Sequence, residues 1–335
     1  FAAAAGLHWQ ELGRTTLGST GDDITVSSLA NKPYLMALGY KISSGNSDFT
    51  WRVGNGSADS GNNYARRQST NGGSDGTGNS TDAMWVDNGG TSNPSFQVGY
   101  FTNIAAQEKL NINHSVGQNT AGAGNAPVRR ETVNKWANTS SVIDVVQGHN
   151  QEGGDYASGS EVVVLGYDPD DTEGGSVWED LKNVELGSNG TLDTGSFTAK
   201  KYLWVQIMVK KTSATSTHGI VFNDDTGSNY SRRRSQDGGS DQTRTAQSAI
   251  YGALDNTNWN SIQMFIINKS DKEKLIIYED TGITATGAGN APGRTEMAAK
   301  WTNTSAQISS IKVVNHDGTA YTADSGSNIQ VWGFD

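Results

Sequence analysis

The chain has 335 residues, a net charge of −10 and no cysteine, which excludes disulfides, thiolate catalysis and cysteine-ligated metals. The acidic balance argues against a nucleic-acid partner, because duplex binding favours a basic surface. No apolar run reaches the roughly 18 residues that a membrane-spanning helix needs.

The first half of the chain carries short apolar runs that are rich in β-branched and aromatic residues. The leading residues 1–6 (FAAAAG) resemble the end of a processed or linker segment. Several later runs alternate between apolar and polar residues, as around Leu110, Ile112 and Val116, and this period is typical of half-buried strands. We expect strands at 23–29, 33–42, 48–54, 82–87, 96–104, 108–116, 141–150 and 160–167.

Three stretches favour helix instead. Residues 128–138 and 293–303 each follow Ala-Pro and place a glutamate four residues before a lysine, a favourable helical pair. Residues 176–182 carry a serine and a glutamate at capping-box spacing, which indicates one helical turn. The sequence therefore predicts one short helix in each half of the chain.

The second half of the chain repeats the first. The string GAGNAP stands at 122–127 and again at 287–292, a separation of 287 − 122 = 165 residues. That distance is too long for a solenoid unit and is the size of a domain. Strands are expected in the second half at 201–211, 217–223, 247–252, 261–268, 273–279, 306–315 and 327–334.

These observations predict an all-β protein of two tandem antiparallel β-sandwich domains of jelly-roll type, each with a short helix. We place the domains at 1–168 and 169–335, with the boundary in the acidic stretch 168–176. GAGNAP matches neither phosphate-binding glycine motif, so we interpret it as the turn that leads into the expected helix.

A second repeated motif is Tyr-x-Arg-Arg followed by GGSD (72–75 and 238–241). It can be a binding site for a sugar or carboxylate, but we favour a structural role in which one of its arginines pairs with a carboxylate such as Asp75 or Glu131 and pins a loop. Together with the Arg/Glu/Trp string that follows GAGNAP, the repeated structural residues are Tyr64, Arg66, Arg67, Arg129, Glu131, Trp136, Tyr230, Arg232, Arg233, Arg294, Glu296 and Trp301.

Two clusters of carboxylates offer hard oxygen ligands of the kind that hold Ca²⁺, although neither has EF-hand spacing. They consist of Asp168, Asp170, Asp171 and Glu173, and of Asp224 and Asp225. The alternative for the first cluster is a solvated interdomain linker. Apart from Ca²⁺ we expect no cofactor.

The sequence holds no signature of an enzyme. Its five histidines form no HxH or HxxxH pair, and no GxSxG elbow is present. We therefore expect no catalytic residues, although paired carboxylates of a glycosidase are recognised only by their separation in the fold.

Three strings resemble repeats in structural proteins of marine phages and archaeal viruses: AGAGNAPVRRETVNKWANTS (121–140), SNYSRRRSQDGGSD (228–241) and SEVVVLGYDPDDT with WEDL (160–172 and 178–181). The resemblance covers most of both copies. It implies a jelly-roll module of a capsid, tail, fibre or decoration protein, located in the virion or outside the cell.

The expected function is self-assembly with identical copies into a shell, tube or fibre. The main alternative is a carbohydrate-binding protein with two lectin-like modules that contact cell-surface glycans through tryptophans such as Trp51, Trp85 and Trp259. A glycosidase is the third alternative.

Overall fold

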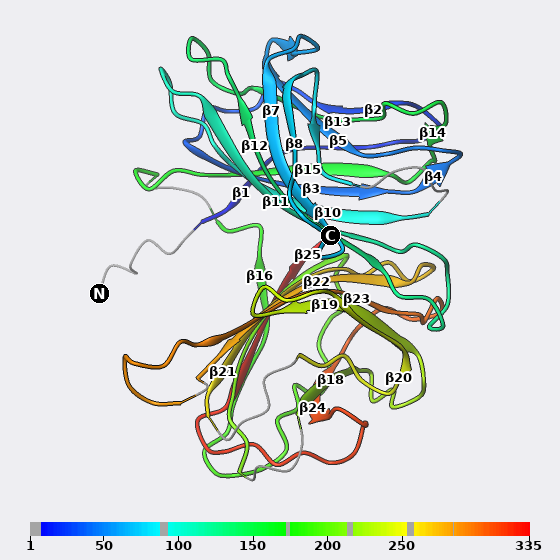
Figure 1. The fold of residues 1–335 in the computed structure, drawn as a ribbon, viewed down its shortest axis with the longest axis vertical. Coiled ribbons are helices and arrows are strands. Elements are labelled where there is room, and N and C mark those ends of the chain that lie inside the picture. Colours follow the sequence, from blue (N-terminus) through cyan, green and yellow to red (C-terminus); the bar gives the residue numbers. More distant parts are fainter. Residues whose placement is uncertain (1–7, 88–92, 172–174, 213–216, 253–257, 284) are drawn as a thin grey trace. The chain divides into compact units, whose positions relative to one another are not determined.

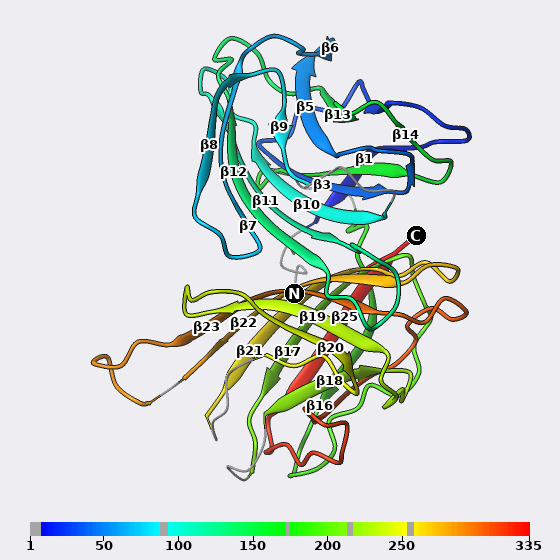
Figure 2. The same ribbon diagram turned by 45° about the vertical axis from the view of Figure 1, so that its right-hand side comes forward.

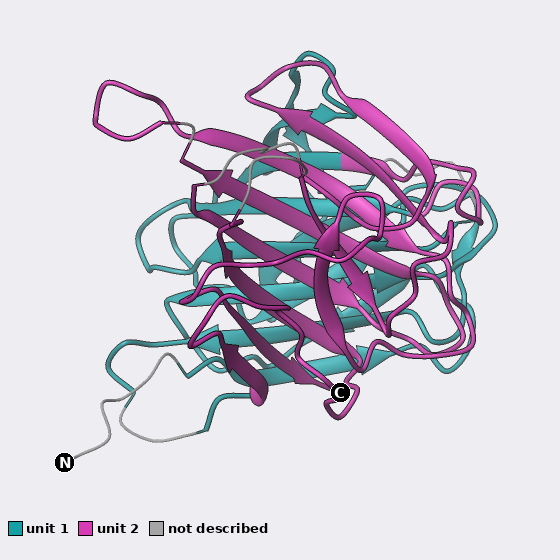
Figure 3. Ribbon diagram, turned by 90° about the horizontal axis from the view of Figure 1, so that it is seen from below, with its two compact units in different colours: residues 1–117, 130–177 teal, residues 118–129, 178–335 magenta. Residues whose placement is uncertain are grey.

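The computed structural model describes residues 8–87, 93–171, 175–212, 217–252, 258–283 and 285–335, and it contains strands and loops but no helix within them. The chain forms two compact units, coloured separately in Figure 3. Unit 1 comprises residues 1–117 and 130–177, and unit 2 comprises residues 118–129 and 178–335. The second unit thus includes a segment of the first sequence copy, whereas the sequence boundary was placed at 168.

Unit 1 is a sandwich of antiparallel strands (Figure 1). Its strands are β1 (Gln10–Thr16), β2 (Asp23–Val26), β3 (Tyr34–Lys41), β4 (Ser43–Ser44), β5 (Thr50–Asn55), β6 (Ser57–Ala58), β7 (Tyr64–Thr70), β8 (Gly76–Thr81), β9 (Met84–Trp85), β10 (Ser95–Thr102), β11 (Lys109–Gly117), β12 (Val128–Trp136), β13 (Val145–His149), β14 (Asp155–Tyr156) and β15 (Glu161–Tyr167). An eight-stranded sheet in the order β1-β15-β3-β10-β11-β12-β7-β8 faces a smaller sheet in the order β2-β13-β5-β6.

Unit 2 repeats this plan. Its strands are β16 (Glu179–Glu185), β17 (Tyr202–Val209), β18 (His218–Phe222), β19 (Tyr230–Gln236), β20 (Gln242–Gln247), β21 (Asn260–Ile267), β22 (Lys274–Gly282), β23 (Gly293–Trp301), β24 (Ile311–Asn315) and β25 (Asn328–Phe334). The eight-stranded sheet runs β16-β25-β17-β21-β22-β23-β19-β20, which matches the order in unit 1 strand for strand (Figure 2). The pair β18-β24 forms the opposite layer.

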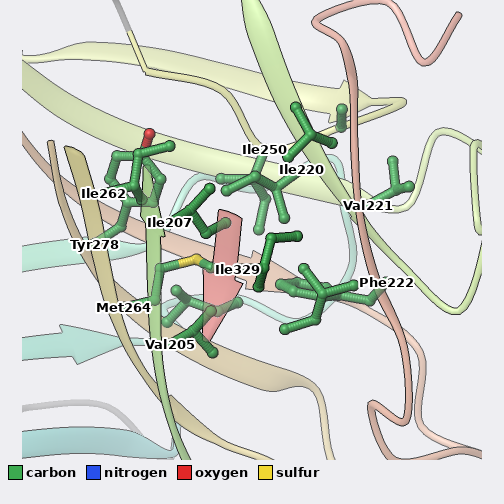
Figure 4. Packing of buried hydrophobic residues seen from close by; sticks show 14 of the residues in the cluster. Val205, Ile207, Ile220, Val221, Phe222, Ile250, Ile262, Met264, Tyr278 and Ile329 are labelled. Atoms are coloured by element: carbon green, nitrogen blue, oxygen red, sulfur yellow. The ribbon is translucent and has the colours of Figure 1, made fainter. Parts of the chain in front are cut away.

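Each core lies between the two layers. In unit 2 it is almost wholly aliphatic and aromatic, with Val205, Ile207 and Ile329 from the large sheet packed against Ile220 and Phe222 of β18 (Figure 4). Unit 1 has the matching cluster, built around the fully buried Trp51. Burial of these alternating side chains supplies the main driving force for both sandwiches. The predicted all-β class and tandem sandwich arrangement are confirmed.

The predicted helices are wrong. Residues 128–138 and 293–303 contain β12 and β23, and residues 176–182 lead into the edge strand β16. In β12, Arg130, Thr132, Asn134 and Trp136 are buried, while Val133 points outward. Inward and outward positions alternate along β12 as in any strand. The alternation does not show as apolar and polar residues, because polar residues occupy most inward positions and find hydrogen-bond partners there. Arg130 donates to Thr70 Oγ1 at 2.9 Å and to the Asp87 carbonyl at 2.8 Å.

Candidate functional site

The repeated Tyr and Trp of the motif form the same hydrogen-bonded knot in both units. In unit 1 the Trp136 Nε1 group donates to Asp59 at 2.8 Å, and the Tyr64 hydroxyl donates to the Asp59 carbonyl at 2.8 Å. Burial would raise the pKa of the Asp59 carboxyl, but hydrogen bonds from Trp136, Gly61 and Asn63 outweigh it and hold the pKa below its ordinary value. Such bonds stabilise the charged form.

Unit 2 builds the knot from Asp225, Tyr230 and Trp301. Trp301 Nε1 donates to Asp225 Oδ2 at 2.7 Å, and the Tyr230 hydroxyl donates to the Asp225 carbonyl at 2.9 Å. Because the two knots share every partner, these residues serve the fold of each unit.

The first arginine of each Tyr-x-Arg-Arg motif packs on an aromatic ring. The Arg66 guanidinium lies 4.8 Å from the centre of the Trp85 ring, and that of Arg232 lies 4.2 Å from the centre of the Tyr251 ring. Burial lowers the pKa of both arginines. A cation held over a ring in this way stabilises the local fold by about 0.5–2 kcal/mol.

Residues 118–129, which we call the first loop, lie on β19, β20 and β23 of unit 2 and contact Glu273 just before β22. Backbone groups of the loop are bound on both sides of the GAGNAP turn. The loop contacts are Gly122 N to Glu273 Oε1 (2.6 Å), Lys300 Nζ to the Thr120 carbonyl (2.6 Å), Ala246 N to the Ala123 carbonyl (2.8 Å), Ser231 Oγ to the Asn125 carbonyl (2.9 Å) and Arg233 Nε to the Pro127 carbonyl (2.9 Å).

One ion pair holds the C-terminal end of the first loop, and a second lies beneath the loop. At its C-terminal end, Arg129 Nη2 lies 2.7 Å from Asp241, and Glu296 adds a second carboxylate at 3.4 Å. Beneath the loop, Lys300 lies 3.3 Å from Glu273, and burial lowers the pKa of Lys300 although Glu273 opposes the shift. Arg129 therefore holds the end of the first loop on unit 2 through carboxylates, a role that the sequence assigned instead to the arginines of Tyr-x-Arg-Arg.

The matching surface of unit 1 has no such cover. The side chains of Lys300 and Glu273 are 0% and 6% exposed, whereas those of the matched pair Lys135 and Glu108 are 43% and 40% exposed. Arg67 and Asp75 likewise form an exposed pair at 3.5 Å. We refer to this surface, formed by Ala65, Arg67, Asp75, Ser80, Glu108, Glu131 and Lys135, as the loop site of unit 1.

An apolar cleft adjoins the loop site on the outer face of the large sheet of unit 1. Its volume is about 720 Å³, and Leu110, Ile112 and Tyr34 line it together with Ala65 and Lys135. Leu110 and Ile112 are 55% and 54% exposed, while their counterparts in unit 2, Leu275 and Ile277, are buried. A second cleft of about 280 Å³ lies over Ala65, Ser80 and Lys135.

The candidate calcium ligands are engaged elsewhere. Asp171 pairs with Lys32, Asp224 pairs with Lys312, and Asp225 belongs to the Trp301 knot. Asp168 accepts a hydrogen bond from the Asp170 backbone N–H at 3.0 Å, and Glu173 lies outside the described residues. Within the described ranges, no three His, Asp or Glu side chains are grouped so that they could hold a metal ion.

The tryptophans proposed as sugar platforms are buried or half-buried. Trp51 is fully buried, and its Nε1 group donates to Asn113 at 2.9 Å, so it cannot stack on a glycan. Trp85 is half-buried beside Arg66, and Trp259 is half-buried against Gly326. The exposed aromatic ring of the cleft is Tyr34, whose position in an apolar run gave no sign of its outward orientation.

No protein-family model matches the chain, and no curated protein matches it. Among solved structures, the LG1-3 region of the laminin alpha2 chain is similar over 93% of this chain, with 9% identity and a TM-score of 0.23. The chain spans 64% of the length of that structure. Domains LG4-5 of the mouse laminin alpha1 chain are similar over 98% of this chain and 92% of theirs, with 10% identity and a TM-score of 0.21. At such scores the likeness assigns no function.

None of the described segments forms a helix that could cross a membrane.

Proposed function

We propose that this protein is a non-enzymatic structural protein that assembles with copies of itself, in a virion or outside the cell. The observation that carries the proposal is the unequal cover of two matched sheet faces. In unit 2, the first loop lies on this face and Leu275 is buried. In unit 1, the same face is open and presents Leu110, Ile112 and Val133 to solvent.

An exposed apolar face of this kind favours association. Contiguous apolar patches on soluble proteins mark interaction surfaces, and burial of such surface contributes about 25 cal/mol per Å². Charged residues lie beside the patch at the loop site, where Lys135 pairs with Glu108 and Arg67 pairs with Asp75. These charges would have to stay paired when neighbouring copies pack together, because burying an unpaired ion is costly.

The duplicated fold suits a shell, tube or fibre. Each chain carries two versions of one sandwich with identical strand order, so that a contact made by one unit has a near-equivalent on the other. Repeated contacts between unlike surfaces generate rings or open filaments.

Sedimentation velocity and negative-stain microscopy over a concentration series test the proposal. We expect large regular assemblies from the wild-type chain. Leu110→Ser with Ile112→Ser should weaken assembly, because it removes apolar surface from the cleft. Ile104→Ser is the matched control, because Ile104 is also an exposed aliphatic residue of unit 1 but lies outside the cleft lining. A wild-type chain that stays monomeric at every concentration would contradict the proposal.

The cleft also favours a second candidate, a carbohydrate-binding protein. The ring centres of Trp9 and Tyr34 lie 5.8 and 6.2 Å, respectively, from the ring centre of Tyr167. Arg67 and Lys135 add polar groups to the lining of the cleft. Rings beside polar groups are the usual platform for a sugar ring. Glycan-array binding by the monomer that Tyr34→Ala abolishes would support this candidate, whereas an absence of glycan binding would contradict it.

A further inference from the structure

We propose that the loop site of unit 1 receives residues 285–294 of a second copy of this chain, so that copies join head to tail. This inference rests on the proposed function and names the segment through which assembly occurs. In this contact, residues 285–294 of one copy bind unit 1 of the next copy in the same way as the first loop binds unit 2 within one chain.

The donor segment, which we call the second loop, has the conformation of the first loop. Gly287 and Gly122 adopt φ values of +90° and +88°, a left-handed region that favours glycine. Asn290 Nδ2 donates to the Thr286 carbonyl at 2.7 Å, as Asn125 Nδ2 does to the Ala121 carbonyl at 2.9 Å. The two loops therefore present the same backbone groups at the same places.

The second loop is exposed in its own chain. Every residue from 285 to 292 is exposed, whereas the matching part of the first loop is partly buried on unit 2. The second loop thus offers the backbone groups at Gly287 and Ala288 that the first loop uses at Gly122 and Ala123.

The acceptor residues are present in unit 1. Glu108 stands at the position of Glu273 and can accept from the Gly287 backbone N–H. Lys135 stands at the position of Lys300 and can donate to the Ala285 carbonyl. In unit 1 these two side chains lie 2.9 Å apart, which keeps the acceptor and the donor together.

The next strand of the loop site also matches. The backbone N–H of Ala246 binds the Ala123 carbonyl, and Ser80 occupies the equivalent place in β8. Ala246 and Ser80 share the same unusual backbone, with φ values of +51° and +53°. Ser80 N can therefore donate to the Ala288 carbonyl of an incoming loop.

The charged end of the loop completes the match. Arg294 corresponds to Arg129, and Asp75 corresponds to Asp241, so that Arg294 of one copy can pair with Asp75 of the next. Glu131 replaces Glu296 as the second carboxylate. One contact is lost, because Ala65 has no hydroxyl where Ser231 donates to Asn125.

Space for the incoming loop is available. The cleft of about 280 Å³ is lined by Ala65, Ser80 and Lys135, the residues matched to those that contact the first loop in unit 2. Ala65 and Lys135 also line the apolar cleft, so the two hollows meet at these residues. Within one chain, the second loop and the loop site of unit 1 are both exposed. Binding between two copies would cover the second loop of one and the loop site of the other.

Cysteine cross-linking tests the contact directly, because the chain has no cysteine of its own. Ala288→Cys with Ser80→Cys should give a ladder of dimers, trimers and longer species on a non-reducing gel after mild oxidation. Ala123→Cys with Ala246→Cys is the matched control, because it joins residues already in contact and should leave the mass of a monomer. Either cysteine alone should give dimers at most.

A charge exchange provides a second measurement that needs no cross-link. Arg294→Glu should raise the concentration required for assembly by about tenfold or more, because it places like charges at the contact. Adding Asp75→Arg to that variant should restore assembly by reversing the pair. Lys182→Glu changes the net charge equally on the edge strand β16 and should leave assembly unchanged.

The outcomes separate the two proposals. A ladder together with rescue by the charge exchange supports the head-to-tail contact. Assemblies that form normally without a ladder and are insensitive to Arg294→Glu overturn the contact but leave the structural function standing. Cross-linking of residues 80 and 288 within a monomer also overturns it, because the loop would then close on its own chain. A chain that never assembles contradicts both.

Discussion

The two units share one strand order and one hydrogen-bonded knot, yet the matched lysines Lys135 and Lys300 experience different surroundings. Lys300 is buried beneath the first loop, and Lys135 is exposed beside an open cleft. The residues are identical, so the difference comes from the neighbouring chain segment. Duplication of the sequence therefore duplicates the fold of each unit but not the surroundings of the matched residues. The exposed site of unit 1 is the one that remains accessible to another molecule.

The interiors of the units also differ at one end. In unit 1, Lys41 forms a buried ion pair with Asp87 at 2.6 Å. Val209 occupies the matching position of β17 in unit 2 and belongs to its aliphatic core. Buried ion pairs add little net stability, since desolvation offsets their attraction. At this position unit 2 therefore has apolar packing where unit 1 has a buried ion pair.

The knots should behave alike in the two units. Trp136→Ala and Trp301→Ala should each lower the free energy of unfolding of their own unit by about 3–5 kcal/mol, because both leave a large cavity in a close-packed core. Calorimetry together with hydrogen exchange of peptides from each unit measures the loss. A clear difference between the two losses in free energy of unfolding would show that the two tryptophans are packed differently despite their equivalent hydrogen bonds.

The matched lysines should behave differently. Lys300→Met leaves Glu273 buried with an uncompensated charge and should cost about 3–5 kcal/mol. Lys135→Met breaks an exposed pair and should cost about 0–1 kcal/mol in the monomer. Chemical denaturation of both variants measures the difference. Equal losses would mean that the first loop does not shield Lys300 in solution.

A buried histidine should give unit 2 a pH dependence that unit 1 lacks. Burial, together with Lys211, lowers the pKa of His218 from 6.5 to about 4, and Phe49 stands at the matching place in unit 1. Between those values the unfolded chain binds more protons, so stability is present above pH 6.5 and is lost as the pH falls toward 4.

His218→Phe should remove that loss, which amounts to about 3 kcal/mol. The opposite slope from Asp280, whose pKa burial raises to about 6, is common to wild type and variant and cancels in their difference. Urea unfolding of both proteins across this pH range is the measurement. A constant difference between the two would contradict the buried neutral imidazole.

The smallest effect is expected at the tyrosines of the knots. Tyr64→Phe and Tyr230→Phe each remove a hydroxyl that bonds to backbone groups, and each should cost about 1 kcal/mol. Equilibrium unfolding in urea measures both. A loss confined to one variant would show that the other hydroxyl is replaced by water without cost.

Much of the fold could be predicted from the alternation of β-branched and aromatic residues, which marks β3, β10, β11 and β15. Strand β12 was missed because it carries polar residues such as Arg130 and Asn134 inward. Strand β23 was missed although Met297 and Ala299 point into the core of unit 2. The pair Glu131 and Lys135 was misinterpreted because its spacing suits a helix. The actual partner of Lys135 is Glu108, which directly precedes the neighbouring strand β11 and is 27 residues away in the sequence.

The loop site could be predicted only in part. The repeated GAGNAP string indicated a turn, but the chain continues from each turn into a strand, β12 or β23, and not into a helix. No pattern in the sequence indicated that Arg129 would pair with Asp241. The sequence could not show that the first loop binds unit 2, because both loops carry GAGNAP with an arginine two residues after it, and either could have remained exposed. Contacts with distant residues distinguish them, such as the pairing of Arg129 with Asp241, 112 residues away.

The proposed head-to-tail contact would give an assembly of this chain a direction. One end of the proposed row of copies would present an unoccupied unit 1 site, and the other would present an exposed second loop. The two tips are chemically distinct, so they can lengthen at different rates and attach to different anchors. A row built in this way has a front and a back, which a contact between two identical surfaces could never provide.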